Sequence, residues 1–74
     1  MTFKEWVDTT FGAGGGGRAA EYLGLPYRTF RSYYINERFP KPTRCQIIVL
    51  KSNYKINVHK WQQAYTNKKN EVDL

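Results

Sequence analysis

Apolar side chains near the start of the chain recur at spacings of three and four residues. These side chains are Phe3, Trp6, Val7 and Phe11. Such spacing places them on one face of a helix. Thr2 and Glu5 are spaced as a capping box at the start of this helix, and Gly12 is a stop signal at its end. The pattern predicts a first helix over residues 3–11.

Glycine and proline divide the rest of the chain into four further helical segments. The glycine run 14–17 interrupts regular structure, and Gly24 follows a short second helix as its stop signal. Pro26 is expected in the first turn of a third helix, where its missing N–H costs nothing. The expected ranges of these helices are about 17–23, 26–36, 43–51 and 58–65.

The stretch 46–58 has two interpretations. It is rich in β-branched residues, and apolar and polar side chains alternate near its end, which is typical of a β-hairpin. Thr43 and Gln46 have capping-box spacing, however, and Asn57 is a good N-cap for a following helix. These caps favour two helices. The alternative is an α+β domain that ends in a β-hairpin.

Length limits the architecture. The chain has 74 residues, enough for one small domain with a thin core. We therefore expect a compact, all-α, five-helix domain over residues 1–66, followed by a polar, frayed tail over residues 67–74. The longest uninterrupted apolar run, residues 47–50, is far too short to span a bilayer, and no signal peptide is visible.

Charge and cysteine content narrow the function. Twelve basic and six acidic residues give a net charge of +6, which favours a polyanionic partner. The single cysteine excludes an internal disulfide and fits a reducing cytoplasm. Cys45 and His59 alone are too few to bind zinc, so we expect neither a metal site nor a cofactor.

The segment 16–35 has the length and the spacing of a helix-turn-helix unit. Ala20 is the small residue that lets two helices cross closely, and Gly24 lies in the turn, where the backbone needs a positive φ. Apolar residues occupy the remaining positions of the motif, namely Leu23, Leu25, Phe30 and Tyr33. A corner of two helices with no DNA-binding role has the same spacing, so the distribution of charge has to decide between them.

Basic residues gather on and after the third helix. Between Tyr22 and Lys60 eight bases stand against one acid, a balance of +7, while the two flanks together carry −1. Two of these bases, Arg28 and Arg31, lie on the polar side of the third helix. A surface of scattered, solvated lysines does not explain that position, so nucleic acid is the expected partner.

Around this unit the chain resembles the Cro and repressor family of phage regulators, which are lambda-repressor-like helix-turn-helix domains. The resemblance covers roughly residues 2–65. It rests on the segments RAAEYLGL (18–25), YRTF (27–30), PKPTR (40–44) and YKINV (54–58). Two positions depart from the family pattern. Gly16 stands where Gln is common, and Pro26 replaces the polar cap of the recognition helix.

The resemblance implies which residues contact DNA. The base-contacting positions of the family match Tyr27, Arg28, Arg31 and Ser32. We expect Arg28 or Arg31 to read guanine and Tyr27 to contact a thymine methyl group or a phosphate. The expected phosphate contacts, which set register, are Gly17, Arg18, Thr29, Arg38, Lys41 and Arg44.

The resemblance also implies a function and its partners. The expected function is a sequence-specific transcriptional regulator, a Cro-like repressor that binds a palindromic operator in double-stranded DNA as a homodimer. Surplus apolar residues on the fourth and fifth helices are candidates for a twofold interface. We expect the protein in the bacterial cytoplasm, associated with the nucleoid, with no membrane partner and no small-molecule ligand. The alternatives are an antitoxin or an accessory protein-interaction module on the same fold.

Other signals have simpler explanations. Residues 12–17 satisfy a G-x-G-x-x-G pattern, but a helix is expected before them where nucleotide binding requires a strand. Cys45 is expected in the core and His59 on the surface. No pair of carboxylates and no nucleophile–base pair is apparent, so we do not expect an enzyme.

Overall fold

The computed structural model describes the backbone of residues 1–72 and the side chains of residues 1–68. Its regular elements are α1 (Phe3–Phe11), α2 (Gly16–Leu23), α3 (Tyr27–Tyr34), α4 (Pro42–Lys51) and α5 (Val58–Val72). No strand occurs in the described residues, so the all-α prediction is confirmed and the alternative β-hairpin over 46–58 is not formed. No helix in this part of the chain is long and apolar enough to cross a membrane.

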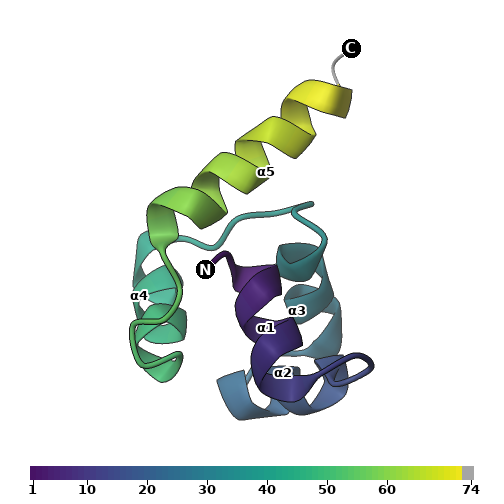
Figure 1. Ribbon diagram of the computed structural model, residues 1–74, viewed down its shortest axis with the longest axis vertical. Helices are drawn as coiled ribbons and strands as arrows, with labels where there is room; N and C mark the ends of the chain where they lie inside the picture. Colours follow the sequence, from purple (N-terminus) through teal and green to yellow (C-terminus); the bar gives the residue numbers. More distant parts are fainter. Residues whose placement is uncertain (73–74) are drawn as a thin grey trace.

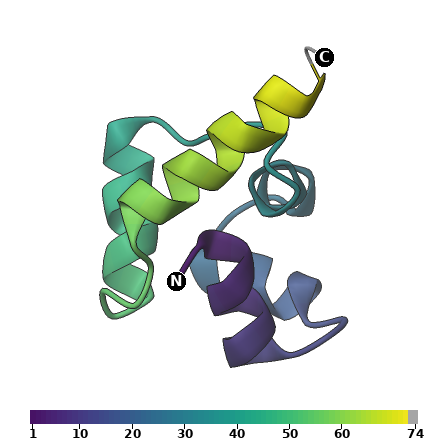
Figure 2. The ribbon, with the colours of Figure 1, turned by 45° about the horizontal axis from the view of Figure 1, so that its top comes forward.

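Helices α1, α2 and α3 pack together, and α4 lies to one side of them (Figure 1). In this view α2 runs across the lower part of the molecule, while α3 stands roughly upright beside α1. α5 starts next to α4, and its far end projects beyond the other helices. Figure 2 shows α5 passing over the connection between α3 and α4, where Lys68 donates a hydrogen bond to the carbonyl of Ile35.

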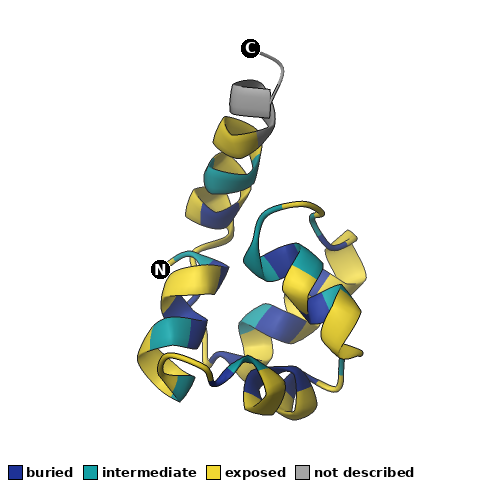
Figure 3. Cartoon of the chain, turned by 90° about the vertical axis from the view of Figure 1, so that its right-hand side faces the viewer, coloured by how far each residue is buried: buried dark blue, intermediate teal, exposed yellow. Residues whose placement is uncertain are grey.

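Aromatic side chains hold the helices around one core. Phe3 of α1 is fully buried and stacks on Trp61 of α5, with ring centroids 4.9 Å apart. Phe30 of α3 packs against the ring of Phe3, with the two ring centroids 5.7 Å apart. Leu23 of α2 and Ile48 of α4 are buried in the same cluster. Figure 3 shows the buried positions on the sides of the helices that face one another.

The predicted bounds of α1 are confirmed at both ends. The backbone N–H of Glu5 donates to Thr2 Oγ1 at 3.2 Å, and the N–H of Thr2 donates to Glu5 Oε1 at 2.8 Å. This is the reciprocal pattern of a capping box. Gly12 ends the helix with a φ of 78°, a conformation that favours glycine.

α3 is shorter than predicted at both ends. Pro26 precedes its first residue and has an extended ψ of 143°. At the other end Asn36 adopts a φ of 60°, which asparagine tolerates better than most residues. The N–H of Glu37 then donates to the carbonyl of Ser32 at 2.9 Å, which satisfies one of the last carbonyl groups of the helix.

α4 begins one residue earlier than predicted, and without the predicted side-chain cap. Pro42 occupies the first helical position, and Lys41 before it is the N-cap residue, with no side-chain capping hydrogen bond. The capping box predicted for Thr43 and Gln46 therefore does not form. The fixed φ and missing N–H of proline suit the first position of a helix, and this moves Thr43 inside it.

α5 begins as predicted but ends later. Asn57 Oδ1 accepts a hydrogen bond of 3.0 Å from the N–H of Lys60, as expected of an N-cap. The helix then runs past Tyr65 to Val72. The tail expected over 67–74 is therefore helical as far as that residue, and residues 73–74 lie outside the described part of the chain. No glycine or proline stands between Tyr65 and Val72 to stop the helix.

Candidate nucleic-acid interface

A three-residue turn joins α2 to α3, and its geometry follows from Gly24. This residue has a φ of 70° and a ψ of 30°, the left-handed conformation that the sequence predicts for it. The N–H of Leu25 donates to the carbonyl of Ala20 at 2.9 Å, as in a Schellman motif. Pro26 then holds the backbone extended before α3 begins. The two helices are thereby set in different directions over a very short connection.

One side of the α2–α3 pair is buried, as the motif requires. The buried residues are Ala20, Leu23, Phe30 and Tyr33, and Leu25 packs against them while partly exposed. Burial of these positions fixes the rotation of α3 about its own axis. The opposite face of α3 is consequently turned to solvent.

The four predicted base-contacting residues lie together on this outer face. Tyr27 is 57% exposed, and Arg28 and Arg31 are exposed as well. Ser32 is partly buried, and its hydroxyl donates to the carbonyl of Arg28 at 3.1 Å. That bond leaves the Ser32 oxygen as an acceptor only.

Neither arginine on the outer face forms an ion pair with a carboxylate of residues 1–68. The ion pair between Lys4 and Asp8 is the one salt bridge found among the described side chains. Arg28 and Arg31 therefore present two guanidinium groups, each with several N–H donors, to whatever lies against α3. Such groups match planar acceptor pairs, including those of phosphate and of guanine.

The start of α2 lies against the start of α3 because Gly16 has no side chain. A Cβ atom at this position would be 3.1 Å from Phe30 Cε2 and 3.6 Å from Tyr27 Cε1. A side chain at this position would require the ring of Phe30 to shift by a few tenths of an ångström, so glycine eases this close approach. The next residue, Gly17, is exposed, with nothing within 4 Å of a Cβ placed on it. The first turn of α2 is thus open next to the outer face of α3.

Two of the predicted phosphate contacts are occupied in bonds within the protein. Arg18 Nη2 donates to the carbonyl of Phe11 at 3.1 Å, so this side chain caps the end of α1. Arg44 Nη1 donates to Tyr33 Oη at 3.1 Å and links α4 to the buried side of α3. The structure thus places both arginines as links between helices.

The remaining predicted phosphate contacts belong to several elements. Thr29 is partly buried on α3 and directly follows Arg28 of the outer face in the sequence. Arg38 and Lys41 are exposed on the connection between α3 and α4. The base-contacting set is therefore gathered on one helix, whereas the phosphate-contacting set is spread over α2, α3, this connection and α4.

A polar cluster that sequence reasoning missed ties α1 to the end of α3. Tyr34 Oη donates to Asp8 Oδ1 at 2.6 Å, and Lys4 Nζ donates to Asp8 Oδ2 at 3.1 Å. The hydrogen bond from Tyr34, followed by that from Lys4, lowers the pKa of Asp8 below its ordinary value. Lys4 and Asp8 have recognisable helical spacing, but the third member is 26 residues away from Asp8.

A second missed link joins α2 to α4. Tyr22 Oη donates to the carbonyl of Lys51 at 2.9 Å, and Lys51 Nζ donates in return to the carbonyl of Tyr22 at 3.3 Å. Lys51 is one of the eight bases between Tyr22 and Lys60. Its ammonium group is directed to α2 and helps to hold the helical pair in place.

The two residues considered for zinc binding lie where the sequence predicts. Cys45 is 6% exposed, and burial raises the pKa of its thiol, which keeps the thiol protonated. His59 is exposed near the start of α5. Within the described residues, no three side chains of the metal-binding types come together.

Comparisons with known proteins leave this site to be interpreted from its own residues. No family model, no curated protein and no solved structure matches the chain.

Proposed function

We propose that the protein is a sequence-specific double-stranded DNA-binding regulator with a lambda-repressor-like helix-turn-helix fold. The observation that supports this best is the outer face of α3. Two arginines that have no carboxylate partner among the described side chains lie there beside an exposed tyrosine, on a helix whose opposite face is fixed in the core. A helix of this kind, held rigidly and projecting donors, suits the major groove.

In this proposal the outer face of α3 reads bases. Arg28 or Arg31 donates two hydrogen bonds to O6 and N7 of a guanine, the commonest specific contact in the major groove. Tyr27 at the start of the helix contacts a thymine methyl group or a phosphate. Ser32 contributes its oxygen as an acceptor, for which the exocyclic amino groups of adenine and cytosine are donors.

Phosphate contacts would set the register of the protein on the duplex. The open first turn of α2 at Gly17 offers backbone N–H groups and the positive end of a helix dipole. Arg38 and Lys41 add exposed positive charge on the connection after α3. These contacts supply affinity without sequence information.

We further propose that two copies bind a palindromic operator and repress transcription in the bacterial nucleoid. A twofold pair would place its two recognition helices about 34–36 Å apart, on successive major grooves. The proposed activity requires no catalytic step and no cofactor.

Selection of bound duplexes from a random library tests the proposal. It predicts enrichment of one motif with inverted-repeat symmetry, a guanine in each half-site and half-site centres about ten base pairs apart. Recovery of duplexes without any shared motif would refute sequence-specific binding. A motif without symmetry would refute binding by two copies, but it would still agree with base reading by α3.

A further inference from the structure

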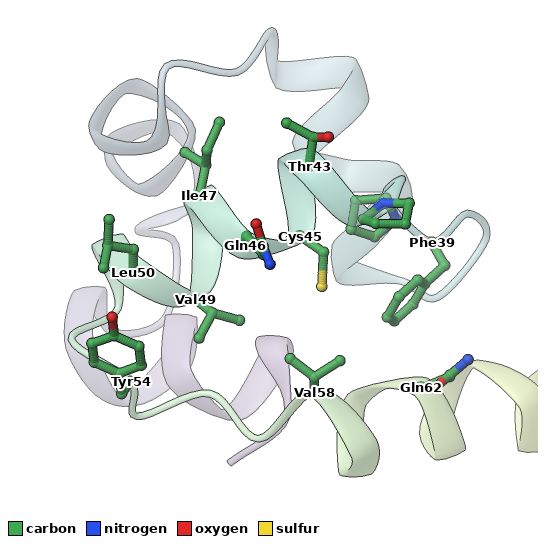
Figure 4. Close-up of a pocket in the computed structure, with 12 residues that line it drawn as sticks. Phe39, Thr43, Cys45, Gln46, Ile47, Val49, Leu50, Tyr54, Val58 and Gln62 are labelled. Carbon is green, nitrogen blue, oxygen red and sulfur yellow. The ribbon is translucent and has the colours of Figure 1, made fainter.

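An apolar groove of about 820 Å³ lies along α4, on a part of the molecule that the proposed DNA contacts of α3 do not use. Side chains of α4, of the connection that follows it and of the first turns of α5 line this groove (Figure 4). Phe39 and Pro42 lie at the end where α4 begins. Leu50 and Tyr54 lie at the end where it finishes.

Several large apolar side chains around the groove remain in contact with solvent. Ile47 is 48% exposed, Leu50 is 59% exposed and Tyr54 is 71% exposed. Val58 of α5 is exposed on the other side of the groove. A contiguous apolar patch of this kind on a small domain is typical of a surface that binds another molecule.

The charge around the groove indicates what kind of molecule it binds. The segment 39–62, which contains all of the lining residues, has five basic residues and no acidic residue. Lys41 stands between two lining prolines, and Lys55 follows the lining Tyr54. Both are exposed, and neither has a carboxylate partner among the described residues.

We propose that this groove binds an acidic amphipathic helix of another protein. Its apolar side chains would fill the groove between α4 and α5, and its carboxylates would pair with Lys55 and, in protein not bound to DNA, with Lys41. α4 has ten residues and is about 15 Å long, which suits a partner helix of roughly three turns with anchors at spacings of three and four.

Two other occupants agree less well with these observations. DNA presents charged phosphates to a protein, and the mostly apolar lining of this groove would remove water from them without a positive charge in return. A second copy of the chain would bring Lys41 and Lys55 against the same two lysines, so like charges would meet across a twofold contact. A partner that supplies carboxylates removes this repulsion. We therefore assign this face to another protein and not to the twofold interface that the sequence suggests for the fourth and fifth helices.

Two matched peptides test the proposal directly. Each has about 12 residues, with leucines at helical spacing on one face and either glutamate or glutamine at the remaining positions. Fluorescence anisotropy measures binding of each to the whole protein. We expect the glutamate peptide to bind about tenfold more tightly than the glutamine peptide, and this preference to disappear in Lys41→Gln/Lys55→Gln.

A double variant of exposed groove residues, Ile47→Ala/Leu50→Ala, completes the test. We expect it to weaken the glutamate peptide about tenfold while the melting temperature of the protein stays unchanged. The proposal is overturned if neither peptide binds, or if both bind wild-type protein equally. It is also overturned if sedimentation shows a wild-type dimer that this variant abolishes, because a second copy then fills the groove.

Discussion

Tyr34, on the last turn of α3, is held by a carboxylate of α1. The short hydrogen bond from its hydroxyl to Asp8 is supported by Lys4, whose ammonium lies 5.4 Å from the centre of the tyrosine ring. Phe30 and Tyr33 fix the rotation of α3 through burial, and this cluster adds a polar link at its far end. The orientation of the outer face therefore depends on α1 as well as on α2.

The lowered pKa of Asp8 makes part of the stability dependent on pH. A carboxyl group whose pKa is lower in the folded state stabilises the fold above its unfolded pKa and loses that contribution as pH falls through its folded value. We expect wild-type protein to lose more stability than Asp8→Asn when pH falls from 7 into the acidic range below the ordinary aspartate pKa. Thermal unfolding at both pH values measures this.

Glu5 supplies the control, since its pKa is lowered by the capping box with Thr2 and by no contact with α3. Glu5→Gln should also reduce the loss of stability that follows a fall in pH. The combined variant Asp8→Asn/Glu5→Gln should reduce it further. The same loss of stability in wild-type protein and Asp8→Asn would show that the ionised carboxylate of Asp8 does not stabilise the fold.

The turn between α2 and α3 depends on one backbone conformation. Gly24→Ala should destabilise the protein by about 1 kcal/mol, because an alanine resists the positive φ of this position. Gly17→Ala is the matched control. It lies in a helix with open space around it and should change stability by less than about 1 kcal/mol, in the favourable direction.

Urea unfolding of the two glycine variants gives this comparison. A Gly24→Ala protein as stable as Gly17→Ala would mean that the turn does not need its left-handed residue. It would also remove the reason for the sharp change of direction before α3.

Local chemistry predicts the helices well where one residue dominates. Thr2 and Gly12 bound α1, and Asn57 starts α5, because each acts on backbone groups within a few residues. The predicted start of α4 was wrong because two signals compete there. Pro42 suits the first helical position better than Thr43 suits the N-cap position. The late end of α5 reflects a missing stop signal, which is harder to recognise than one that is present.

The candidate site divides in the same way. Spacing along a single helix predicts that Arg28, Arg31 and Ser32 share a face, and the structure places them together. It does not predict that Arg18 bonds to the end of α1 or that Arg44 bonds to Tyr33. Those contacts join residues that only the packing of different helices brings together.

The whole molecule carries its excess of positive charge in the segment from Tyr22 to Lys60. If this segment faces phosphates, the logarithm of DNA affinity should fall steeply and linearly with the logarithm of salt concentration. Lys41→Ala should reduce that slope by about 1, since it removes one phosphate contact. Anisotropy titrations at several salt concentrations measure the slope, and an affinity independent of salt would contradict any DNA-binding role.

Reading of sequence by the outer face of α3 is the central claim, and the ratio of affinities for selected and random duplex DNA tests it most directly. Arg31→Ala should reduce this ratio by about ten- to a hundredfold, corresponding to a lost contact of about 1–3 kcal/mol with a base. Lys41→Ala should weaken both duplexes alike and leave the ratio unchanged. Equal losses on the two duplexes for Arg31→Ala, and likewise for Arg28→Ala, would contradict the claim.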